Sequence, residues 1–416
     1  MANSTEYDFD SYEALIKKLL EQIKILPPPL RKELEKQLDE LIRLIQEIRS
    51  PRFMVIGRRG AGKSSLINAL FNAKVAETGA VEAQTGEPQW YEFEHKGKKV
   101  EILDTRGILE GGKPKENDTA SDPIESILNA VREKCPDIVL FLCKATEVDS
   151  AINESLEVFE RIIKKIKEIH QYNLPVIGVL THCDQIYPSD ILKLPTDDEE
   201  KNQNIQKSVE LLQKHLASRQ TINDHFVKVI PTAAFVRYRN DGTADPNRDY
   251  RWNIDTLAEL LVEELPNGPA IEFARLARLR KFQKQIAKNV VNLCTLATGT
   301  VGATSLPGSD FPILVAIQSA MVVVIGFISG RDLSLQAATE FLTALGINVG
   351  TGFVLREVAR GVVKLIPGFG NVVSAGVAGT GTKILGQASI AYFIDGTPIP
   401  VIKEQMGLKM LLPNDQ

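Results

Sequence analysis

The sequence predicts an α/β protein. A three-layer domain with a mostly parallel sheet is expected at its centre, with an N-terminal helical hairpin before it and an all-α, glycine-rich, apolar domain after it. Three observations lead to this prediction. Apolar runs that suit buried strands alternate with helical patterns over residues 51–265. A glycine-rich loop stands between the first strand and the first helix of that series. Beyond it, residues 292–394 carry few charges and many glycines.

Length and composition bound the number of domains and the kinds of partner. A chain of 416 residues is too long for one ordinary domain. We expect a helical hairpin at 1–50, the α/β domain at 51–265, the helical domain at 266–396 and a tail at 397–416. A hydrophobic content of 44% and a charged content of 25% are typical of globular proteins. The formal net charge of −4 gives no basic signal, so nucleic acid is not an expected partner.

The cysteines and the first residues predict a cytoplasmic protein. The four cysteines show neither disulfide nor metal-ligand spacing, which suits a reducing compartment. The first ten residues are acidic and lack an apolar core, so they do not have the pattern of a signal peptide.

Two helices are expected before the α/β domain. Ser11–Ile25 has apolar residues at helical spacing, and Pro27–Pro29 ends that helix because proline lacks the N–H and clashes with the preceding turn. Leu30–Ile48 carries one narrow apolar stripe, with charges on its other face. Two interpretations of the stripe stay open: it packs against another domain, or it associates with a second copy of the chain.

The strands and helices of the central domain follow from short apolar runs and from helix-start signals. Lys96-Gly97-Lys98 between two alternating runs predicts a hairpin, and Asp122-Pro123 predicts a helix start. The expected strands are Arg52–Ile56, Gln89–His95, Lys99–Asp104, Ile138–Cys143, Val176–Leu180 and Val227–Ile230. The expected helices are Ser65–Phe71, one that begins at Pro123, Ile152–Ile169, Gln203–Ser218 and Trp252–Glu264.

The C-terminal region is predicted to be helical, and its relation to a membrane stays open. Ile271–Val290 is a basic helix, and Phe311–Ile328 has no charged residue. Leu306-Pro307-Gly308 and Ile366-Pro367-Gly368 each precede an apolar stretch, which suggests two similar helical hairpins. A membrane span needs about 20 apolar residues, so Phe311–Ile328 is borderline. Residues 271–394 therefore either contact membrane lipid, as a peripheral or integral element at the cytoplasmic face, or pack as a tight bundle.

The loop after the first strand fits the phosphate-binding pattern G-x-x-x-x-G-K-[ST], as Gly57-Arg58-Arg59-Gly60-Ala61-Gly62-Lys63-Ser64. Its glycines let backbone N–H groups converge on phosphate oxygens, and the helix that continues from Ser65 adds a favourable dipole. Lys63 is expected on the β- and γ-phosphates, and Ser64 on Mg²⁺. The loop therefore predicts a nucleoside triphosphate site.

Four further stretches, in order along the chain, predict which nucleotide binds. In Ala83-Gln84-Thr85-Gly86, Thr85 is a candidate Mg²⁺ ligand at the core of a mobile switch. In Asp104-Thr105-Arg106-Gly107, Asp104 can hold the Mg²⁺ water shell and the Gly107 N–H can sense the γ-phosphate. In Thr181-His182-Cys183-Asp184, the Asp184 carboxylate can accept from guanine N1–H and N2–H₂, a donor pair that adenine lacks. Thr232-Ala233-Ala234 can give a backbone N–H to the guanine carbonyl.

With these five elements in this order, residues 51–265 resemble the G domain of Era-type, translation-factor-related P-loop GTPases, in which they read GxxxxGKS, a switch threonine, DTPG, NKxD and SAx. The resemblance implies GTP and GDP as ligands, Mg²⁺ as cofactor, and hydrolysis of GTP to GDP and phosphate. It implies catalytic roles for Lys63, Thr85 and Gly107, and Mg²⁺ ligation by Ser64, Thr85 and Asp104. The nucleotide-binding residues that it implies are Gly57, Arg58, Arg59, Gly60, Ala61, Gly62, Lys63, Ser64, Ser65, Asp104, Gly107, Thr181, His182, Asp184, Thr232, Ala233 and Ala234.

The chain departs from the family pattern at three positions, and Ile108, which is apolar as in Era-type relatives, also bears on hydrolysis. Arg106 replaces the usual proline, which loosens the turn. His182 replaces a lysine whose stem packs over guanine, although an imidazole can stack there. Gly60 stands where potassium-dependent relatives carry asparagine, so potassium activation is not expected. Ile108 cannot orient water as the glutamine of Ras-like enzymes does. Slow hydrolysis is therefore predicted, unless a partner or a second G domain completes the site.

Two further points bear on partners. Arg58 and Arg59 either stabilise transition-state charge across a G-domain dimer or are solvated loop residues. Residues 266–416 resemble, by their Pro-Gly turns and uncharged helices, an apolar domain fused to bacterial GTPases of this type and found in YcjF-like membrane proteins. Helices on both sides of a G domain are also the plan of immunity-related and dynamin-like GTPases, which is a likeness of architecture alone.

Three functions are compatible with these features. The first is a GTP-binding protein that hydrolyses GTP slowly and uses the nucleotide cycle to control membrane attachment or assembly. The second is a nucleotide-gated scaffold with negligible turnover. The third is a dynamin-like GTPase that remodels membranes. Besides GTP and GDP, the expected partners are membrane lipid, through residues 271–394, and a second copy of the chain, through the G domains or the N-terminal helices.

Overall fold

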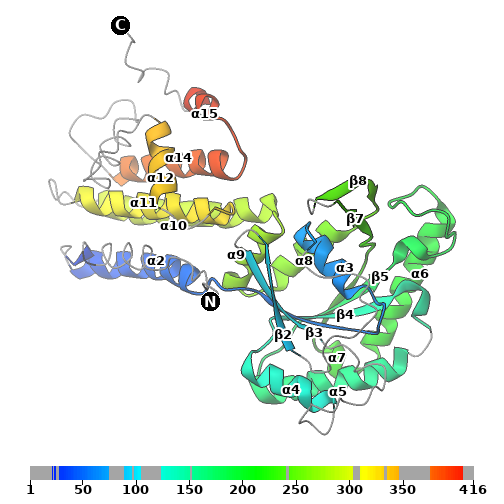
Figure 1. The fold of residues 1–416 in the computed structure, drawn as a ribbon. Helices are drawn as coiled ribbons and strands as arrows, with labels where there is room; N and C mark the ends of the chain where they lie inside the picture. The colour runs from blue at the N-terminus through cyan, green and yellow to red at the C-terminus, as the bar shows by residue number, and fades with distance from the viewer. Residues whose placement is uncertain are drawn as a thin grey trace, which may run out of the picture. The chain divides into compact units, whose positions relative to one another are not determined.

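Figure 1 shows the computed structural model of the chain, which describes residues 21, 23–24, 28–74, 89–95, 98–104, 123–149, 152–239, 243–302, 310–331, 335–345 and 375–405. The chain divides into two compact units. One is Arg49–Ala277, and the other joins Met1–Ile48 with Arg278–Gln416. The segments before and after the α/β unit therefore belong to one compact unit, although they lie far apart in the sequence.

The Arg49–Ala277 unit is built on a six-stranded sheet in the order β2-β3-β1-β4-β5-β6. Every neighbouring pair is parallel except β2–β3, which is antiparallel. This is the predicted α/β fold, and the carboxyl ends of its parallel strands meet at one edge. The strands are β1 (Arg52–Gly57), β2 (Gln89–His95), β3 (Lys98–Asp104), β4 (Ile138–Lys144), β5 (Val176–Thr181) and β6 (Phe226–Pro231).

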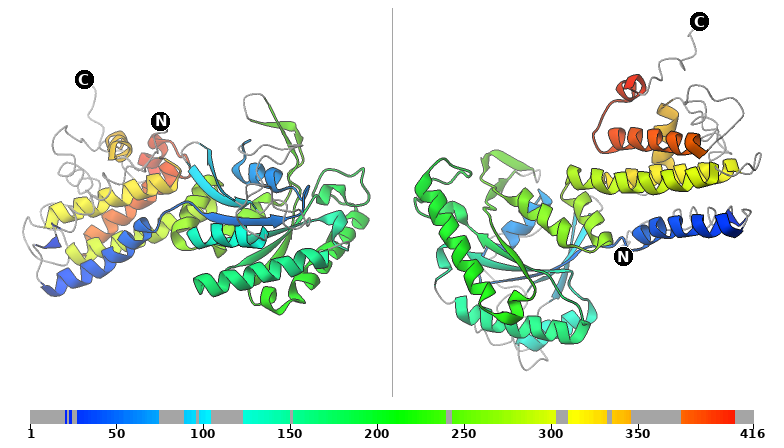
Figure 2. Two further views of the ribbon diagram at one scale, coloured as in Figure 1. Left: turned by 60° about the horizontal axis from the view of Figure 1, so that its bottom comes forward. Right: turned by 180° about the vertical axis from the view of Figure 1, so that it is seen from behind.

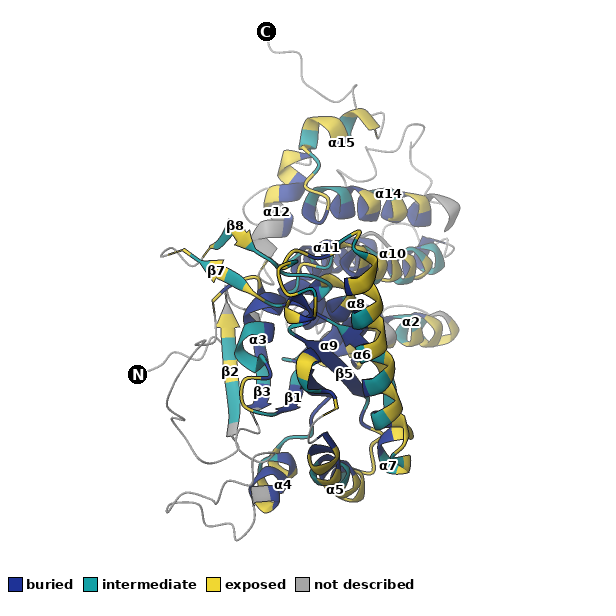
Figure 3. Ribbon diagram, turned by 90° about the vertical axis from the view of Figure 1, so that its right-hand side faces the viewer, coloured by how far each residue is buried: buried dark blue, intermediate teal, exposed yellow. Residues whose placement is uncertain are grey.

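Helices cover both faces of this sheet, which is why β1, β4 and β5 are buried along nearly their whole length. One face packs against α4 to α7 in a shared apolar core, and the other is covered by α3, α8 and α9 (Figure 1). Figure 3 shows the buried central strands between these two layers. The helices are α3 (Lys63–Phe71), α4 (Pro123–Glu133), α5 (Ile152–His170), α6 (Glu199–Ala217), α7 (Gln220–Asn223), α8 (Ile254–Glu264) and α9 (Asn267–Leu276).

The six strands of the sheet agree with the sequence prediction to within one residue at each end. The predicted helix Gln203–Ser218 begins earlier, at Glu199, because the Asp198 carboxylate caps it by accepting from the Lys201 N–H at 2.7 Å. The short hairpin β7 (Val236–Tyr238) and β8 (Ala244–Asp249) was not predicted, since Ala-Asp-Pro-Asn-Arg-Asp has no strand pattern and contains proline.

The prediction of one continuous basic helix over Ile271–Val290 is wrong. The structure has two helices, because α9 ends at Leu276 and α10 (Arg280–Gly302) begins beyond a break. Arg278, within the break, has a φ of 55°, a left-handed value that a right-handed helix does not contain. Neither glycine nor proline marks this position, so the helical pattern of the sequence continues through it.

The second unit is all helical in the residues that the structure describes. α10 lies beside α2, α11 and α14, and α11 also packs on α12 and α14 (Figure 2). α11 is buried almost all round, which suits its apolar sequence, so this stretch forms the core of a helical bundle. Within the described ranges, no helix combines the length and the hydropathy that crossing a bilayer requires. The remaining helices are α2 (Pro28–Gln46), α11 (Asp310–Ile328), α12 (Leu335–Ala344), α14 (Ala375–Phe393) and α15 (Ile399–Gln405).

Small residues on α14 allow close contact with α10. A Cβ on Gly386 would lie 2.5 Å from the Val291 Cγ2, and a Cβ on Gly379 would lie 3.4 Å from the Thr295 carbonyl oxygen. The two glycines are seven residues apart, so they share one face of the helix. Glycine therefore serves helix packing here, as the bundle interpretation of the sequence predicts.

Some predicted features lie outside the described residues. These are the Pro-Gly turns at 306–308 and 366–368 and most of the helix Ser11–Ile25. Within the expected tail the structure has a helix, α15, whose Ile402 is buried. The expected boundary at 265/266 falls just before α9, which belongs to the unit that contains the sheet. The domain ranges themselves remain expectations.

Candidate functional site

The phosphate-binding loop lies at the carboxyl edge of the sheet, between the end of β1 and the start of α3. Gly60 and Gly62 have φ values of 79° and 86°, in the left-handed region that glycine enters without strain. Gly57 is packed closely, since a Cβ there would lie 2.9 Å from both the Cβ and the carbonyl oxygen of Leu142 on β4. At each of these three positions a larger side chain would strain the backbone or clash with a neighbour, so the shape of the loop requires glycine.

Lys63 is the first residue of α3, and its side chain lies against the loop. Its Nζ donates to the Gly57 carbonyl at 2.6 Å and to the Arg58 carbonyl at 3.3 Å. An ammonium group in this place can also donate to phosphate oxygens held by the loop, because it has three donors on a flexible stem. Ser64 and Ser65 follow in the first helical turn and are partly exposed.

The residues at this edge fit Mg²⁺ bound together with a nucleotide. The Ser64 hydroxyl lies at the helix start, and Asp104 ends β3, in register with Val55 of β1. Oxygen donors of this kind, completed by phosphates and water, are what Mg²⁺ prefers. The Asp104 side chain, Thr85 and Gly107 lie outside the described residues. The described part has no cluster of three or more His, Cys, Asp or Glu that could hold a metal.

A hydroxyl joins the phosphate-binding loop to the predicted base-recognition segment. Thr181 is the last residue of β5, and its buried Oγ1 donates to the Ala61 carbonyl at 2.9 Å, with the Cys143 carbonyl at 3.3 Å. The Ala61 N–H in turn donates to the Arg58 carbonyl at 3.1 Å. Thr181 and Ala61 are 120 residues apart in the sequence, so the fold itself brings the two segments together.

His182 covers the phosphate-binding loop from the side of β5. A Cβ on Gly62 would lie 3.0 Å from the His182 Cε1, and the His182 Nδ1 lies 3.1 Å from the Thr181 Oγ1. Burial lowers the pKa of His182 below its usual 6.5, so the ring is uncharged at neutral pH. An uncharged flat ring therefore stands where the family pattern has a lysine.

Asp184 presents a buried carboxylate next to this loop. It lies in the 3₁₀ turn η3 (Cys183–Gln185) and is only 7% exposed. Among the residues that the structure describes, none donates a hydrogen bond to its carboxylate oxygens. Its carboxylate oxygens are not among the fully buried atoms without a partner, so they remain accessible to a ligand that brings N–H groups.

Thr232, Ala233 and Ala234 lie directly beside the Asp184 segment. The Cys183 N–H donates to the Thr232 carbonyl at 3.2 Å, and the Thr232 N–H donates to the Leu180 carbonyl at 2.7 Å. Ala233 forms an isolated bridge with Trp252. The fold thus brings both predicted base-recognition segments and the phosphate-binding loop to one edge of the sheet.

The two loop arginines differ in their surroundings. The Arg58 Nη2 lies 3.9 Å from the Glu154 Oε2 on α5, at the long end of an ion pair, and the Glu154 side chain is 82% exposed. Arg59 is exposed at the tip of the loop. Both interpretations of these arginines therefore stay open.

The cysteines at this edge do not offer a nucleophile. Cys143 lies near the end of β4, Cys183 lies two residues beyond the end of β5, and both are buried. Burial raises the pKa of each thiol to about 12, so both stay protonated and unreactive at neutral pH.

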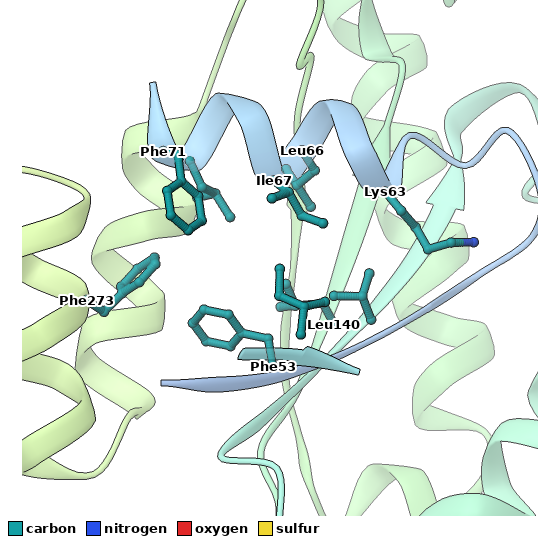
Figure 4. A pocket seen from close by; sticks show the side chains of 10 residues that line it. Phe53, Lys63, Leu66, Ile67, Phe71, Leu140 and Phe273 are labelled. Carbon is teal, nitrogen blue, oxygen red and sulfur yellow. The ribbon is translucent and has the colours of Figure 1, made fainter. Parts of the chain in front are cut away.

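A pocket beneath α3 serves packing. Figure 4 shows Phe53, Phe71 and Phe273 around it, with the Lys63 nitrogen pointing away from these rings. Apart from Lys63, its walls are hydrocarbon, so it offers a nucleotide no polar partner. The contacts here seat α3, and with it the phosphate-binding loop, on the sheet.

One contributor was not predicted from the sequence. Lys201, in the first turn of α6, is fully buried and donates to the Asp184 carbonyl. A lysine in the first turn of a charged helix is ordinarily solvated, so the sequence carried no signal for it.

The chain is similar to several known proteins. Residues 52–182 match the family model described as 50S ribosome-binding GTPase. YkfA of Escherichia coli (strain K12) is 29% identical over 154 residues, which are 35% of this chain and 48% of that protein. YfjP of the same organism is 25% identical over 281 residues, 66% of this chain and 83% of that protein. The crystal structure of Toc33 from Arabidopsis thaliana in complex with Mg²⁺ and GMPPNP has a TM-score of 0.35 and 18% identity, covering 61% of this chain and 96% of that one.

The sheet and the loop after β1 define a P-loop nucleotide-binding domain. The match over residues 52–182 shows that this part of the chain is similar to that GTPase family, in agreement with the sequence motifs. The chain spans about half the length of YkfA, at 48%.

Proposed function

We propose that this chain binds GTP and GDP with Mg²⁺ through its G domain and hydrolyses GTP slowly. One observation carries the proposal: Thr181, at 2.9 Å from the Ala61 carbonyl, ties the phosphate-binding loop to the segment of Asp184. A phosphate cradle and a buried carboxylate then lie at the same edge of the sheet. A guanine nucleotide has the charged phosphates for the first and the paired N–H donors for the second.

The remaining roles follow from the motifs. The backbone of Gly57–Ser65 and the Lys63 ammonium would hold the phosphates, and Ser64, Thr85 and Asp104 would hold Mg²⁺. When bound, Mg²⁺ neutralises charge on the transferred phosphoryl group. The Gly107 N–H would report the γ-phosphate. At the other end of the nucleotide, His182, Asp184 and the backbone of Thr232–Ala234 would contact the base.

A titration against ATP tests base selection. GTP is expected to bind roughly 100-fold more tightly than ATP or better, because a site built to pair with N–H donors rejects a base that lacks them. Equal affinity for the two nucleotides would overturn the proposal.

Slow turnover rests on Ile108, which cannot orient water. If Arg59 of a second copy completes the site, the rate per molecule rises with protein concentration, and Arg59→Ala removes that rise without weakening GDP binding. A rate independent of concentration and unchanged in Arg59→Ala excludes activation across a dimer. If the protein is instead a scaffold with negligible turnover, GTP bound at the site stays unhydrolysed in a single-turnover experiment. Brisk hydrolysis in that experiment would exclude the scaffold alternative.

The helical unit is proposed to link the nucleotide cycle to attachment or assembly. Arg280, Lys281 and Lys288 are exposed on the first half of α10, and a basic helix of this kind suits an anionic lipid surface. The test is cosedimentation of the full chain with phosphatidylglycerol or phosphatidylcholine vesicles, with GTP or GDP. Nucleotide-dependent binding to the anionic vesicles supports attachment, whereas binding to neither excludes it. Tubulated vesicles under GTP would favour the remodelling alternative.

A further inference from the structure

Lys201 is buried to a degree that is rare for lysine. It lies in the first turn of α6, and its exposure is 0%. Its Nζ donates three hydrogen bonds to backbone carbonyls, to Asp184 at 2.8 Å, to Ile186 at 2.7 Å and to Pro188 at 3.0 Å. All three ammonium protons are therefore used, on the last residue of the base-recognition segment and on two residues of the turn that follows it.

A lysine ammonium group ordinarily stays in contact with water, so the burial of Lys201 has an energetic cost. Burial lowers the pKa of Lys201, while the charges of Asp184, Asp190 and Asp198 act in the opposite direction. No carboxylate forms an ion pair with it among the described residues. The charge is stabilised chiefly by carbonyl dipoles, so the positions of ammonium and turn depend on each other.

The contacts fix the backbone around Asp184 from both sides. Before it, the Cys183 N–H is held by the Thr232 carbonyl at 3.2 Å, and after it Lys201 holds the Asp184 carbonyl. Lys201 is itself fixed, since its own N–H is bound by the Asp198 cap at 2.7 Å. Only the side-chain torsions of Asp184 are then left to set where its carboxylate points.

We propose that Lys201 is a positioning residue for base recognition. Its ammonium holds the turn Asp184–Pro188 so that the Asp184 carboxylate meets both guanine N–H donors, and this sets the preference for guanine over hypoxanthine, which lacks the 2-amino group. The inference rests on the proposed binding of guanine nucleotides at Asp184. Lys201 does not touch the base, so it acts through Asp184 alone.

The test compares GDP and IDP affinities of the full chain in Lys201→Met and in Lys207→Met. Lys207 lies on the same helix but is exposed, which makes the second variant a matched control. Lys201→Met is expected to bind GDP about tenfold more weakly and to lose most of the GDP-over-IDP preference. Lys201→Arg keeps the charge and should restore part of that preference. Lys207→Met should behave as the unmodified protein.

A double-mutant cycle separates positioning from a merely structural role. If Lys201 acts through Asp184, then Lys201→Met changes GDP affinity by less than about twofold in an Asp184→Ala background. An equal loss in both backgrounds, or an unchanged GDP-over-IDP ratio in folded Lys201→Met, overturns the inference. Should Lys201→Met fail to fold, Lys201→Gln is measured in the same cycle and decides by the same criteria.

Failure of this inference can be told from failure of the proposed function. If Asp184→Asn leaves GDP affinity unchanged, guanine recognition at Asp184 is wrong and the inference falls with it. If Asp184→Asn loses GDP while folded Lys201→Met keeps its full preference, only the positioning role of Lys201 is wrong.

Discussion

Replacing Thr181 with valine removes one hydroxyl and keeps the shape of the side chain. The Thr181 Oγ1 donates to the Ala61 carbonyl at 2.9 Å, and both residues are buried. A buried carbonyl that loses its donor costs about 1–2 kcal/mol, because water cannot replace the lost hydrogen bond. Since Ala61 belongs to the phosphate-binding loop, the change should reach nucleotide affinity as well as stability.

The assay measures both quantities on the same variant. Urea unfolding should show Thr181→Val to be less stable by about 1–2 kcal/mol, and a GDP titration should show roughly tenfold weaker binding. Thr181→Ser keeps the hydroxyl and is expected to bind GDP as the unmodified protein does. If Thr181→Val binds GDP with unchanged affinity, the hydroxyl does not position the loop and the reasoning is refuted.

Two further predictions concern packing and pH. Gly386→Ala should destabilise the helical unit by about 1–3 kcal/mol in thermal unfolding, because its Cβ would lie 2.5 Å from Val291. Gly379→Ala, with its nearest atom at 3.4 Å, should cost less, and equal effects would contradict the close approach of α14. Burial lowers the pKa of His225 below 6.5, and the positive charge of Lys167 lowers it further. The unfolded chain then takes up the proton first, so stability is lost as the pH falls below 6.5, and His225→Leu should flatten that loss in urea unfolding at several pH values.

The strands could be predicted from the sequence because their signals are local. Ile138–Lys144 and Val176–Thr181 are continuous apolar runs, as strands covered on both faces require. The break at Arg278 could not be predicted, since an arginine carries no local preference for a left-handed φ. The helix Phe311–Ile328 was ambiguous in sequence, because a bundle core and a bilayer select the same apolar residues.

The candidate site likewise has some features that the sequence predicts and others that only the structure reveals. The glycines and Lys63 of the phosphate-binding loop were predictable, because their spacing reflects a backbone requirement that the sequence records directly. The link between Thr181 and Ala61 joins residues 120 positions apart, and the three carbonyls that accept from Lys201 lie 13 to 17 residues before it. Such contacts exist only in the tertiary structure, so a single sequence does not reveal them.

The exchange of one acceptor for a donor at Asp184 tests guanine recognition most directly. Asp184→Asn replaces a carboxylate oxygen with an amide N–H₂, which repels the guanine N–H groups and can donate to the 2-oxo group of xanthine. Titration of the purified full chain should show GDP affinity reduced roughly 100-fold or more and XDP affinity increased. Unchanged GDP affinity in the folded variant, with no gain for XDP, would contradict the account.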